Sequence, residues 1–355
     1  MHAPTADLRI RTARPLLSPA ILEEDLPLPD GGAALVQATR RAIGEILAGR
    51  DHRLLAVVGP CSIHDPAAAL DYADHLRSVA DRLAADLLVV MRVYFEKPRT
   101  VVGWKGLIND PRLDGSFQIN HGLRLARQLM LDINARGMPV ATEFLDTTLG
   151  QYYADLVSWG AIGARTVESQ IHRELASGLS MPVGFKNRTD GELQVAVDAI
   201  RSARHQHWFP SLTREGAPAV LATTGNDQGH LVLRGGLSGP NYSREHIVRA
   251  THLLTDAGLP PIVMVDCSHG NSGKVPEQQV PVAADVAAQV AVGQRAIIGF
   301  MIESNLVGGS QSHEGGKPLT YGQSITDACL GFDATVPALE TLARAAGARR
   351  RVLRA

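Results

Sequence analysis

The sequence lacks the features that mark secreted, membrane and nucleic-acid-binding proteins. Its 355 residues include only three cysteines, Cys61, Cys267 and Cys329, which are too few for a disulfide scaffold and are expected to be buried thiols or ligands. The formal net charge is −1, whereas nucleic-acid and anionic-lipid surfaces need clustered Lys and Arg in excess. No apolar run is long enough for a signal peptide or a transmembrane helix. These absences predict a cytoplasmic protein with no nucleic-acid or membrane partner.

The chain does contain eight short apolar stretches that alternate with helical patterns from about residue 54 onward. Because these stretches are almost continuously apolar, they indicate a parallel sheet that helices cover. The apolar fraction of 45% can supply the core of one such unit. The eight expected strands are residues 54–59, 87–93, 139–143, 161–165, 182–186, 230–234, 262–266 and 296–302. This pattern predicts the α/β class and a (β/α)8 TIM barrel.

The regions outside this repeat predict an extension and an insertion. Residues 1–50 form an N-terminal extension, residues 51–355 form the catalytic barrel, and residues 205–229 predict a β-hairpin inserted before the sixth strand. Asp65 and Pro66 predict the start of a helix, because Asp is a good N-cap and Pro suits the first helical position. Further helices are expected over 123–133, 152–159, 169–179 and 190–203, and a surface connection over the glycine-rich residues 308–316.

Four side chains that can bind a metal follow expected strands or lie near the end of the chain. Cys61, His269, Glu303 and Asp327 offer a thiolate, an imidazole and two carboxylates, a mixed set that suits a divalent first-row metal. Taken singly, each also fits a structural role, since a lone Cys packs as a small hydrophobe and a lone His or Glu caps a helix. Their shared position at strand ends favours one metal site. His64 forms a Cys-x-x-His spacing with Cys61 but is interpreted as a loop residue.

Six basic residues are expected to converge on one end of the barrel, where the carboxyl ends of the strands meet. They are Arg92, Lys97, Arg99, Arg165, Lys186 and Arg234. Arg binds phosphate and carboxylate groups through two hydrogen bonds, and Lys acts as a compact point charge. In a chain of nearly zero net charge, this concentration predicts one or two small anionic substrates, with phosphorylated metabolites as the obvious class. At most about two of the six are expected to pair with Glu143, Asp146 or Glu168 instead, since buried charges need compensation.

A set of short motifs at these positions resembles a known family over nearly the whole chain. The motifs are Gly59-Pro-Cys-Ser-Ile-His64, Arg92 with Phe95-Glu-Lys-Pro-Arg-Thr100, Gly103-Trp-Lys-Gly106, Gly160-Ala-Ile-Gly-Ala-Arg165, Gly184-Phe-Lys-Asn187, Leu233-Arg-Gly-Gly236, Asp266-Cys-Ser-His269, Met301-Ile-Glu-Ser304 and Ser324-Ile-Thr-Asp327. The family is that of the type I 3-deoxy-D-arabino-heptulosonate 7-phosphate (DAHP) synthases. The resemblance implies condensation of phosphoenolpyruvate with D-erythrose 4-phosphate and water to DAHP and phosphate. This reaction is the first step of the shikimate pathway to chorismate and the aromatic amino acids.

The resemblance also implies a role for each candidate residue. One divalent ion per subunit, with Mn2+ favoured over Fe2+, Co2+ or Zn2+, is held by Cys61, His269, Glu303 and Asp327. The residues implied to bind phosphoenolpyruvate are Arg92, Arg165, Lys186, Arg234, Glu143, Gly163 and Ala164. Those implied to bind erythrose 4-phosphate are Lys97, Pro98, Arg99 and Thr100. Lys97 is the expected proton donor, and Cys61 and His269 take part in catalysis through the metal.

Regulation is the third property that the resemblance implies. The N-terminal extension and the hairpin resemble the family's oligomerisation and effector-binding elements, so the chain is expected to form a homodimer or homotetramer that an aromatic amino acid inhibits. Serine instead of glycine at position 211 favours phenylalanine or tryptophan over tyrosine. The candidate effector contacts are Gln151, Leu175, Leu179, Ser180, Phe209 and Ser211. Ordinary helix packing is the alternative for these positions.

Two residues call for separate hypotheses. Arg188 stands where glycine is expected in much of the family, and it either adds charge at the cavity mouth, relieves a left-handed backbone requirement or points to solvent. Cys329 lies two residues after Asp327 and is expected to approach Cys61 and form a disulfide with it on oxidation.

Two other classes of function remain open. A related synthase acting on another sugar phosphate, such as arabinose 5-phosphate, shares the barrel, but the Lys97-Pro-Arg-Thr100 motif favours erythrose 4-phosphate. A catalytically inactive barrel that regulates a partner such as chorismate mutase is disfavoured, because candidate residues occupy every metal and substrate position.

Overall fold

Eight parallel strands close into a barrel. The computed structural model describes residues 5–99, 101–314 and 318–354. Each barrel strand pairs in parallel with the next, and β1 pairs with β10 to complete the ring. The barrel strands are β1 (Leu54–Gly59), β2 (Leu87–Arg92), β3 (Val140–Glu143), β4 (Val157–Ile162), β5 (Val183–Lys186), β8 (Gly229–Leu233), β9 (Val263–Asp266) and β10 (Ile297–Asn305). The predicted (β/α)8 TIM barrel is confirmed.

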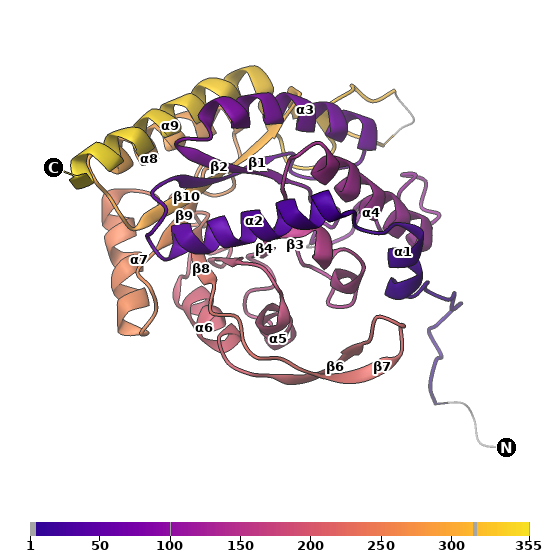
Figure 1. Cartoon of the computed structure of the whole chain (residues 1–355). Helices are drawn as coiled ribbons and strands as arrows, with labels where there is room; N and C mark the ends of the chain where they lie inside the picture. The colour runs from indigo at the N-terminus through magenta and orange to yellow at the C-terminus, as the bar shows by residue number, and fades with distance from the viewer. Residues whose placement is uncertain (1–4, 100, 315–317, 355) are drawn as a thin grey trace.

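Helices between the strands cover the outside of the barrel (Figure 1). The first of them begins as its sequence predicts: the Asp65 side chain accepts hydrogen bonds from the backbone N–H groups of Ala67 and Ala68, and Pro66 is the first helical residue. The outer helices are α3 (Pro66–Leu83), α4 (Ile119–Ala135), α5 (Gln170–Gly178), α6 (Gln194–Ala203), α7 (Arg244–Asp256), α8 (Gln279–Ala291) and α9 (Phe332–Arg354).

The connection between β3 and β4 differs from the prediction. Instead of a helix over 152–159, the chain forms two short 3-10 turns, η1 (Leu149–Tyr152) and η2 (Ala154–Leu156), and β4 begins at Val157. The aromatic residues explain the error, because Tyr152 packs in the outer core while Trp159 belongs to the cluster inside the barrel. Their spacing therefore reflects two different structures and not one helical face.

The N-terminal extension covers the amino-terminal end of the barrel. Its helices are α1 (Pro19–Asp25) and α2 (Asp30–Leu47), and α2 lies across the strands in Figure 1. Ile43 and Ile46 of α2 are 0% and 2% exposed and belong to the same buried cluster as Trp159. Burial of each such side chain contributes ~1.5–3 kcal/mol, so α2 is firmly held against the barrel.

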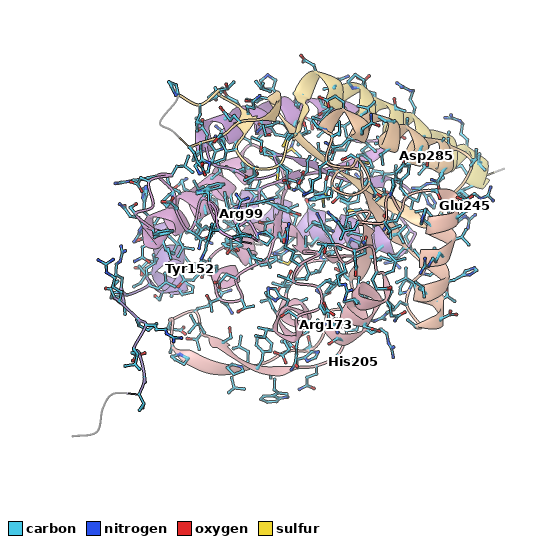
Figure 2. The ribbon with its side chains drawn as sticks, turned by 180° about the vertical axis from the view of Figure 1, so that it is seen from behind. Arg99, Tyr152, Arg173, His205, Glu245 and Asp285 are labelled. Carbon is cyan, nitrogen blue, oxygen red and sulfur yellow. The ribbon has the colours of Figure 1, made fainter. Side chains whose placement is uncertain are left out.

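The insertion before β8 forms the predicted hairpin. β6 (Trp208–Leu212) and β7 (Pro218–Ala222) pair antiparallel, and they extend along the lower edge of the molecule, outside the ring of strands, in Figure 1. His205, at the start of this insertion, is labelled in Figure 2, which shows the molecule from behind. The hairpin is therefore an addition to the barrel, and its two strands are not barrel strands.

The segment after β10 contains more regular structure than the sequence predicts. The expected surface connection begins with β11 (Val307–Ser310), which pairs with β12 (Gln323–Ser324), while β13 (Leu330–Gly331) pairs with β10. A short turn, η3 (Pro276–Gln278), precedes α8. Within the described ranges, no helix is both long and apolar enough to cross a membrane.

Candidate functional site

One cavity of about 960 Å³ at the carboxyl ends of the strands collects most of the predicted substrate residues. Those that line it are Lys97, Pro98, Arg99, Glu143, Gly163, Ala164, Arg165, Lys186 and Arg234. His269 and Asp327 line the same cavity. Thr100 lies outside the described residues. Arg99 is labelled in Figure 2, on the loop that follows β2. Basic side chains at the ends of four different strands, or on the loops that follow them, thus meet around one space large enough for two small anions.

The wall formed by Glu143 and Gly163 depends on the absence of a side chain at position 163. A Cβ atom there would lie 2.1 Å from Glu143 Oε1, so a larger residue would require the Glu143 carboxylate to move from its present position. Glu143 is 8% exposed, and its Oε1 accepts no hydrogen bond from the described residues. A buried carboxylate oxygen without a partner is costly, so this atom is available to a ligand in the cavity.

Next to the cavity, three candidate metal ligands lie close together. The ligand atoms of Cys61, Glu303 and Asp327 are all within 4.8 Å of one another. His269 Nε2 is 3.6 Å from Glu303 Oε1, which places the fourth predicted ligand beside the other three. Cys61 and Glu303 are buried. Four residues that are far apart in the sequence therefore form one cluster of thiol, imidazole and carboxylate groups.

The charges in this cluster fit a bound divalent cation. Burial and the nearby Glu303 carboxylate raise the pKa of the Cys61 thiol. Partial burial raises the pKa of Asp327, but Lys97 and His269 more than offset that effect and hold it below its usual range. A divalent ion placed among these groups would favour the thiolate and relieve the repulsion between the acidic groups. The donor set is one that first-row divalent metals accept.

Comparison with known proteins identifies the family. The model of the DAHP synthetase I family matches residues 32–340. The chain is 56% identical over 350 residues to the Phe-sensitive phospho-2-dehydro-3-deoxyheptonate aldolase of Escherichia coli (strain K12), across 99% of this chain and 100% of that protein. The chain belongs to the DAHP synthetase I family. It is also 52% identical over 345 residues to the Trp-sensitive enzyme of the same strain, across 97% of this chain and 99% of that protein.

A solved structure agrees with this assignment. The phospho-2-dehydro-3-deoxyheptonate aldolase of Francisella tularensis SCHU S4 matches with a TM-score of 0.94 and 53% sequence identity, across 96% of this chain and 99% of that chain. The resemblance predicted from the motifs is confirmed. As a DAHP synthase, the chain condenses phosphoenolpyruvate with erythrose 4-phosphate at the first step of the shikimate pathway.

Arg92 of this DAHP synthase lies beside the metal-ligand cluster and not in the cavity wall. Its guanidinium is 1% exposed, donates to Glu303 Oε1 at 2.9 Å and to the Pro60 carbonyl at 3.3 Å, and lies 4.0 Å from the centre of the Tyr94 ring. Glu303 reaches it because β10 and β2 both flank β1. The inward-facing Arg92 therefore supports a candidate metal ligand directly.

Two of the six basic residues form ion pairs with acidic residues in the described part of the chain, but the partners differ from those expected. Arg92 pairs with Glu303, and Lys186 Nζ donates to Asp266 Oδ2 at 2.9 Å. The expected partners were Glu143, Asp146 and Glu168, which lie closer in sequence to the basic residues. In each pair the two strands flank the same third strand but are far apart in sequence, so these pairs could not be predicted from spacing.

The role of Asp266 was missed in the sequence. This carboxylate ends β9 and is fully buried, and it contacts both Lys186 and His269. A signal was present, because Asp266 opens the Asp-Cys-Ser-His motif at the carboxyl end of a strand, where polar residues in this fold serve the active site.

Glu96, next to the candidate proton donor, is a buried acid without a basic partner among the described residues. It is 4% exposed and accepts hydrogen bonds from the Tyr153 hydroxyl at 3.2 Å and from the Asp146 N–H at 3.5 Å. Burial, and then the nearby Asp146 carboxylate, raise the pKa of Glu96 to about 8. The acid is therefore protonated in the folded protein over much of the neutral range.

Glu96→Gln should make the free energy of unfolding less sensitive to rising pH. The folded-state pKa of about 8 exceeds the usual value of 4.5, so the folded state binds the proton more tightly and loses stability as pH rises between these values. The free energy of unfolding of the wild type, relative to Glu96→Gln, should fall by roughly 2–4 kcal/mol from pH 5 to pH 8. Urea unfolding at both pH values measures this. Glu277→Gln, at an exposed position, is the control variant. A constant difference between the wild type and Glu96→Gln would contradict the assignment.

A second cavity, of about 720 Å³, lies between α2, α5 and the hairpin. All six predicted effector contacts line it: Gln151, Leu175, Leu179, Ser180, Phe209 and Ser211. Helix α2 belongs to the N-terminal extension, which was predicted to take part in effector binding, and it adds Val36, Gln37 and Arg40 to the wall. These three residues were not predicted individually. Arg40 also donates to the Val157 carbonyl at 2.7 Å and to the Ala154 carbonyl at 2.8 Å. One helix of the extension thus forms a wall of this cavity and contacts the start of β4.

Arg188 and Cys329 are both placed by specific contacts. Arg188 donates to both carboxylate oxygens of Asp190 and to Glu168 at 3.2 Å, it does not line the substrate cavity, and its φ is not positive. It therefore ties the loop after β5 to the loop after β4. The Cys61 N–H donates to Cys329 Sγ at 3.3 Å, and both thiols are free, so their oxidation to a disulfide remains a prediction.

Proposed function

We propose that the 960 Å³ cavity binds both substrates of the DAHP synthase reaction side by side. Phosphoenolpyruvate is held by Arg165, Lys186 and Arg234, with Glu143 and the backbone of residues 163–164 assisting. Erythrose 4-phosphate is held by the loop after β2, through Lys97, Pro98, Arg99 and Thr100. The observation that carries the proposal is the convergence of five basic side chains from four strands on one cavity beside a cluster of metal-binding groups.

The metal proposal is that Cys61, His269, Glu303 and Asp327 hold one divalent ion, with Mn2+ as the best candidate. When bound, an ion of this kind would polarise the aldehyde oxygen of the sugar phosphate. Arg92, at 2.9 Å from Glu303 Oε1, fixes the direction of that carboxylate. It also adds positive charge close to the bound phosphoenolpyruvate.

Lys97 is the proposed proton donor, because it lies between the residues proposed to bind phosphoenolpyruvate and those proposed to bind erythrose 4-phosphate. Its Nζ is 3.1 Å from Cys61 Sγ and 3.2 Å from the Cys61 carbonyl. Burial opposes its charge, but Cys61 and Glu303 more than offset this and raise the pKa of Lys97, so it remains a cation. As C3 of phosphoenolpyruvate attacks the aldehyde carbon, Lys97 protonates the developing alkoxide. Water then adds at C2, and phosphate leaves with cleavage of its C–O bond.

The reaction is tested by measuring phosphoenolpyruvate consumption by chelator-treated protein, with and without added Mn2+. Consumption should require erythrose 4-phosphate and metal together, and arabinose 5-phosphate should not replace erythrose 4-phosphate. Consumption with arabinose 5-phosphate alone would favour the related synthase. No consumption with either sugar and any of the four metals would favour a regulatory barrel.

The second cavity is proposed to bind an aromatic amino acid that inhibits the reaction. Two relatives of similar identity are named Phe-sensitive and Trp-sensitive, and Ser211 lines the cavity. We therefore expect phenylalanine or tryptophan, and not tyrosine, to be the effector. Assays with each amino acid separate these choices.

Leu175→Trp should weaken inhibition strongly while leaving catalysis intact. Leu175 lines the effector cavity, and the larger side chain fills space that the effector ring requires. The inhibitor concentration for half-maximal effect should rise by roughly 10-fold or more, equivalent to about 1.4 kcal/mol of lost binding, with kcat within about twofold. Ile171→Trp is the matched control, because Ile171 lies one turn earlier on α5, is 57% exposed and does not line the cavity. Unchanged inhibition of Leu175→Trp would argue against this cavity.

Assembly and location complete the proposal. Leu8, Ile10 and Trp208 are between 63% and 70% exposed on the N-terminal extension and the hairpin, and large exposed apolar side chains favour contact with another subunit. A homodimer or homotetramer is therefore expected, and light scattering measures which forms. Three free cysteines support a reducing compartment such as the cytoplasm.

A further inference from the structure

Asp266 joins the substrate cavity to the metal-ligand cluster through a single oxygen atom. Its Oδ2 lies 2.9 Å from Lys186 Nζ and 2.9 Å from His269 Nδ1. Its Oδ1 is already engaged, because it accepts from the Ser268 N–H at 3.0 Å and from the Ser268 hydroxyl at 2.6 Å. The carboxylate is thus fixed in place, and Lys186 and His269 share the remaining oxygen.

Lys186 and His269 serve different proposed ligands, the anionic substrate and the metal ion respectively. Lys186 lines the substrate cavity, where it faces an anionic substrate. His269 Nδ1 lies 2.7 Å from the Ser268 hydroxyl and 2.9 Å from Asp266 Oδ2, and its Nε2 lies 3.6 Å from Glu303 Oε1. A carboxylate that accepts a hydrogen bond from one imidazole nitrogen makes the other nitrogen a better metal ligand. Asp266 Oδ2 lies 2.9 Å from both Lys186 Nζ and His269 Nδ1, so the two side chains share one carboxylate oxygen.

We propose that Asp266 is a positioning residue that couples metal binding to phosphoenolpyruvate binding. The inference rests on the proposed function of the cavity. A phosphate group that attracts Lys186 Nζ weakens its bond to Asp266 Oδ2, which leaves that oxygen to His269. His269 then becomes a stronger metal ligand. Because binding couplings are reciprocal, the metal strengthens phosphoenolpyruvate binding by the same factor.

The experiment is calorimetric titration of Mn2+ into chelator-treated full-length protein, with and without saturating phosphoenolpyruvate. In the wild type, phosphoenolpyruvate should lower the Kd for Mn2+ roughly fivefold or more. In Asp266→Asn, the Kd without substrate should rise about 10-fold to 100-fold, and phosphoenolpyruvate should change it by less than about twofold. Asp285→Asn is the control. It removes an exposed carboxylate on α8, so it should keep the wild-type coupling.

The outcomes separate the coupling from the function of the cavity. The inference is overturned if phosphoenolpyruvate lowers the Kd for Mn2+ as much in Asp266→Asn as in the wild type. Direct attraction between substrate and metal would then explain the coupling. Phosphoenolpyruvate that does not bind the wild type in its own titration contradicts the proposed function instead. Circular dichroism establishes first whether Asp266→Asn folds.

A measurement on the wild type tests the coupling if Asp266→Asn does not fold. In protein labelled with 15N-histidine and loaded with diamagnetic Zn2+, the His269 Nδ1–H resonance should move downfield when phosphoenolpyruvate is added, because its hydrogen bond to Asp266 strengthens. The His269→Gln variant assigns the signal. A resonance that stays in place while phosphoenolpyruvate binds overturns the inference.

Discussion

Lys97→Ala should lower kcat by a factor of about 10² to 10⁴, the usual contribution of a general acid, in the Mn2+-loaded enzyme. Lys97 Nζ contacts the Cys61 sulfur and carbonyl and lines the substrate cavity. Its loss removes both the proton donor and the positive charge between the proposed substrates. The bound metal can balance the acidic groups that Lys97 leaves behind, so thermal unfolding should change little. Steady-state kinetics and a melting curve on the same preparation measure both quantities.

Two further variants show which property of Lys97 matters. Lys97→Arg keeps the charge but replaces the ammonium with a guanidinium, which does not release its proton, so it should recover the KM for erythrose 4-phosphate without recovering kcat. Lys105→Ala is the matched control, because Lys105 lies on the same loop, is exposed and does not line the cavity. A Lys97→Ala enzyme with wild-type kcat would rule out the proposed role.

Asp327→Asn should weaken Mn2+ binding by a factor on the order of 100, at the upper end of the range for residues that only orient metal ligands. Among the candidate ligands, Asp327 is the best to replace. Its side chain is the exposed one of the three-residue cluster, whereas a change at Glu303 would leave Arg92 buried without its 2.9 Å ion-pair partner. Activity should fall at low Mn2+ concentration and recover at high concentration. Calorimetry and a metal titration of the activity measure these effects.

Asp285→Asn provides the control for a general loss of negative charge. Asp285 is exposed on α8 and labelled in Figure 2, away from the cluster. The Asp285→Asn variant should bind Mn2+ with wild-type affinity. If Asp327→Asn did the same, Asp327 would not be a ligand, and the site would be restricted to Cys61, His269 and Glu303.

The barrel could be predicted because each β/α unit carries its own local signals. β1 runs over the predicted residues 54–59, and the helix after it starts at the predicted Asp65 and Pro66. Local signals failed where the long-range environment decided the structure. The aromatic pattern around Tyr152 and Trp159 looked helical, but one ring packs outside the barrel and the other inside it.

The candidate site, like the fold, could be predicted where local signals decide the structure and could not be predicted where long-range contacts decide it. Residues at strand ends, such as Lys186 and His269, could be predicted to converge because all parallel strands end on one side. Their partners could not, since nothing in the sequence shows that Asp266 is shared between these two or that Glu303 pairs with Arg92. Arg188 shows the limit for a single residue, because only the structure distinguishes its pairing with Asp190 from a place in the cavity.

The position of the hairpin has a consequence for how such an enzyme changes over time. β5 pairs directly with β8 across the insertion, and among the described strands β6 and β7 pair only with each other. The ring of strands is therefore complete without them. Phe209 and Ser211 in the hairpin, however, line the cavity proposed to bind the effector. Changes in the hairpin would therefore allow a lineage to exchange, lose or acquire an inhibitor while the catalytic barrel is inherited unchanged.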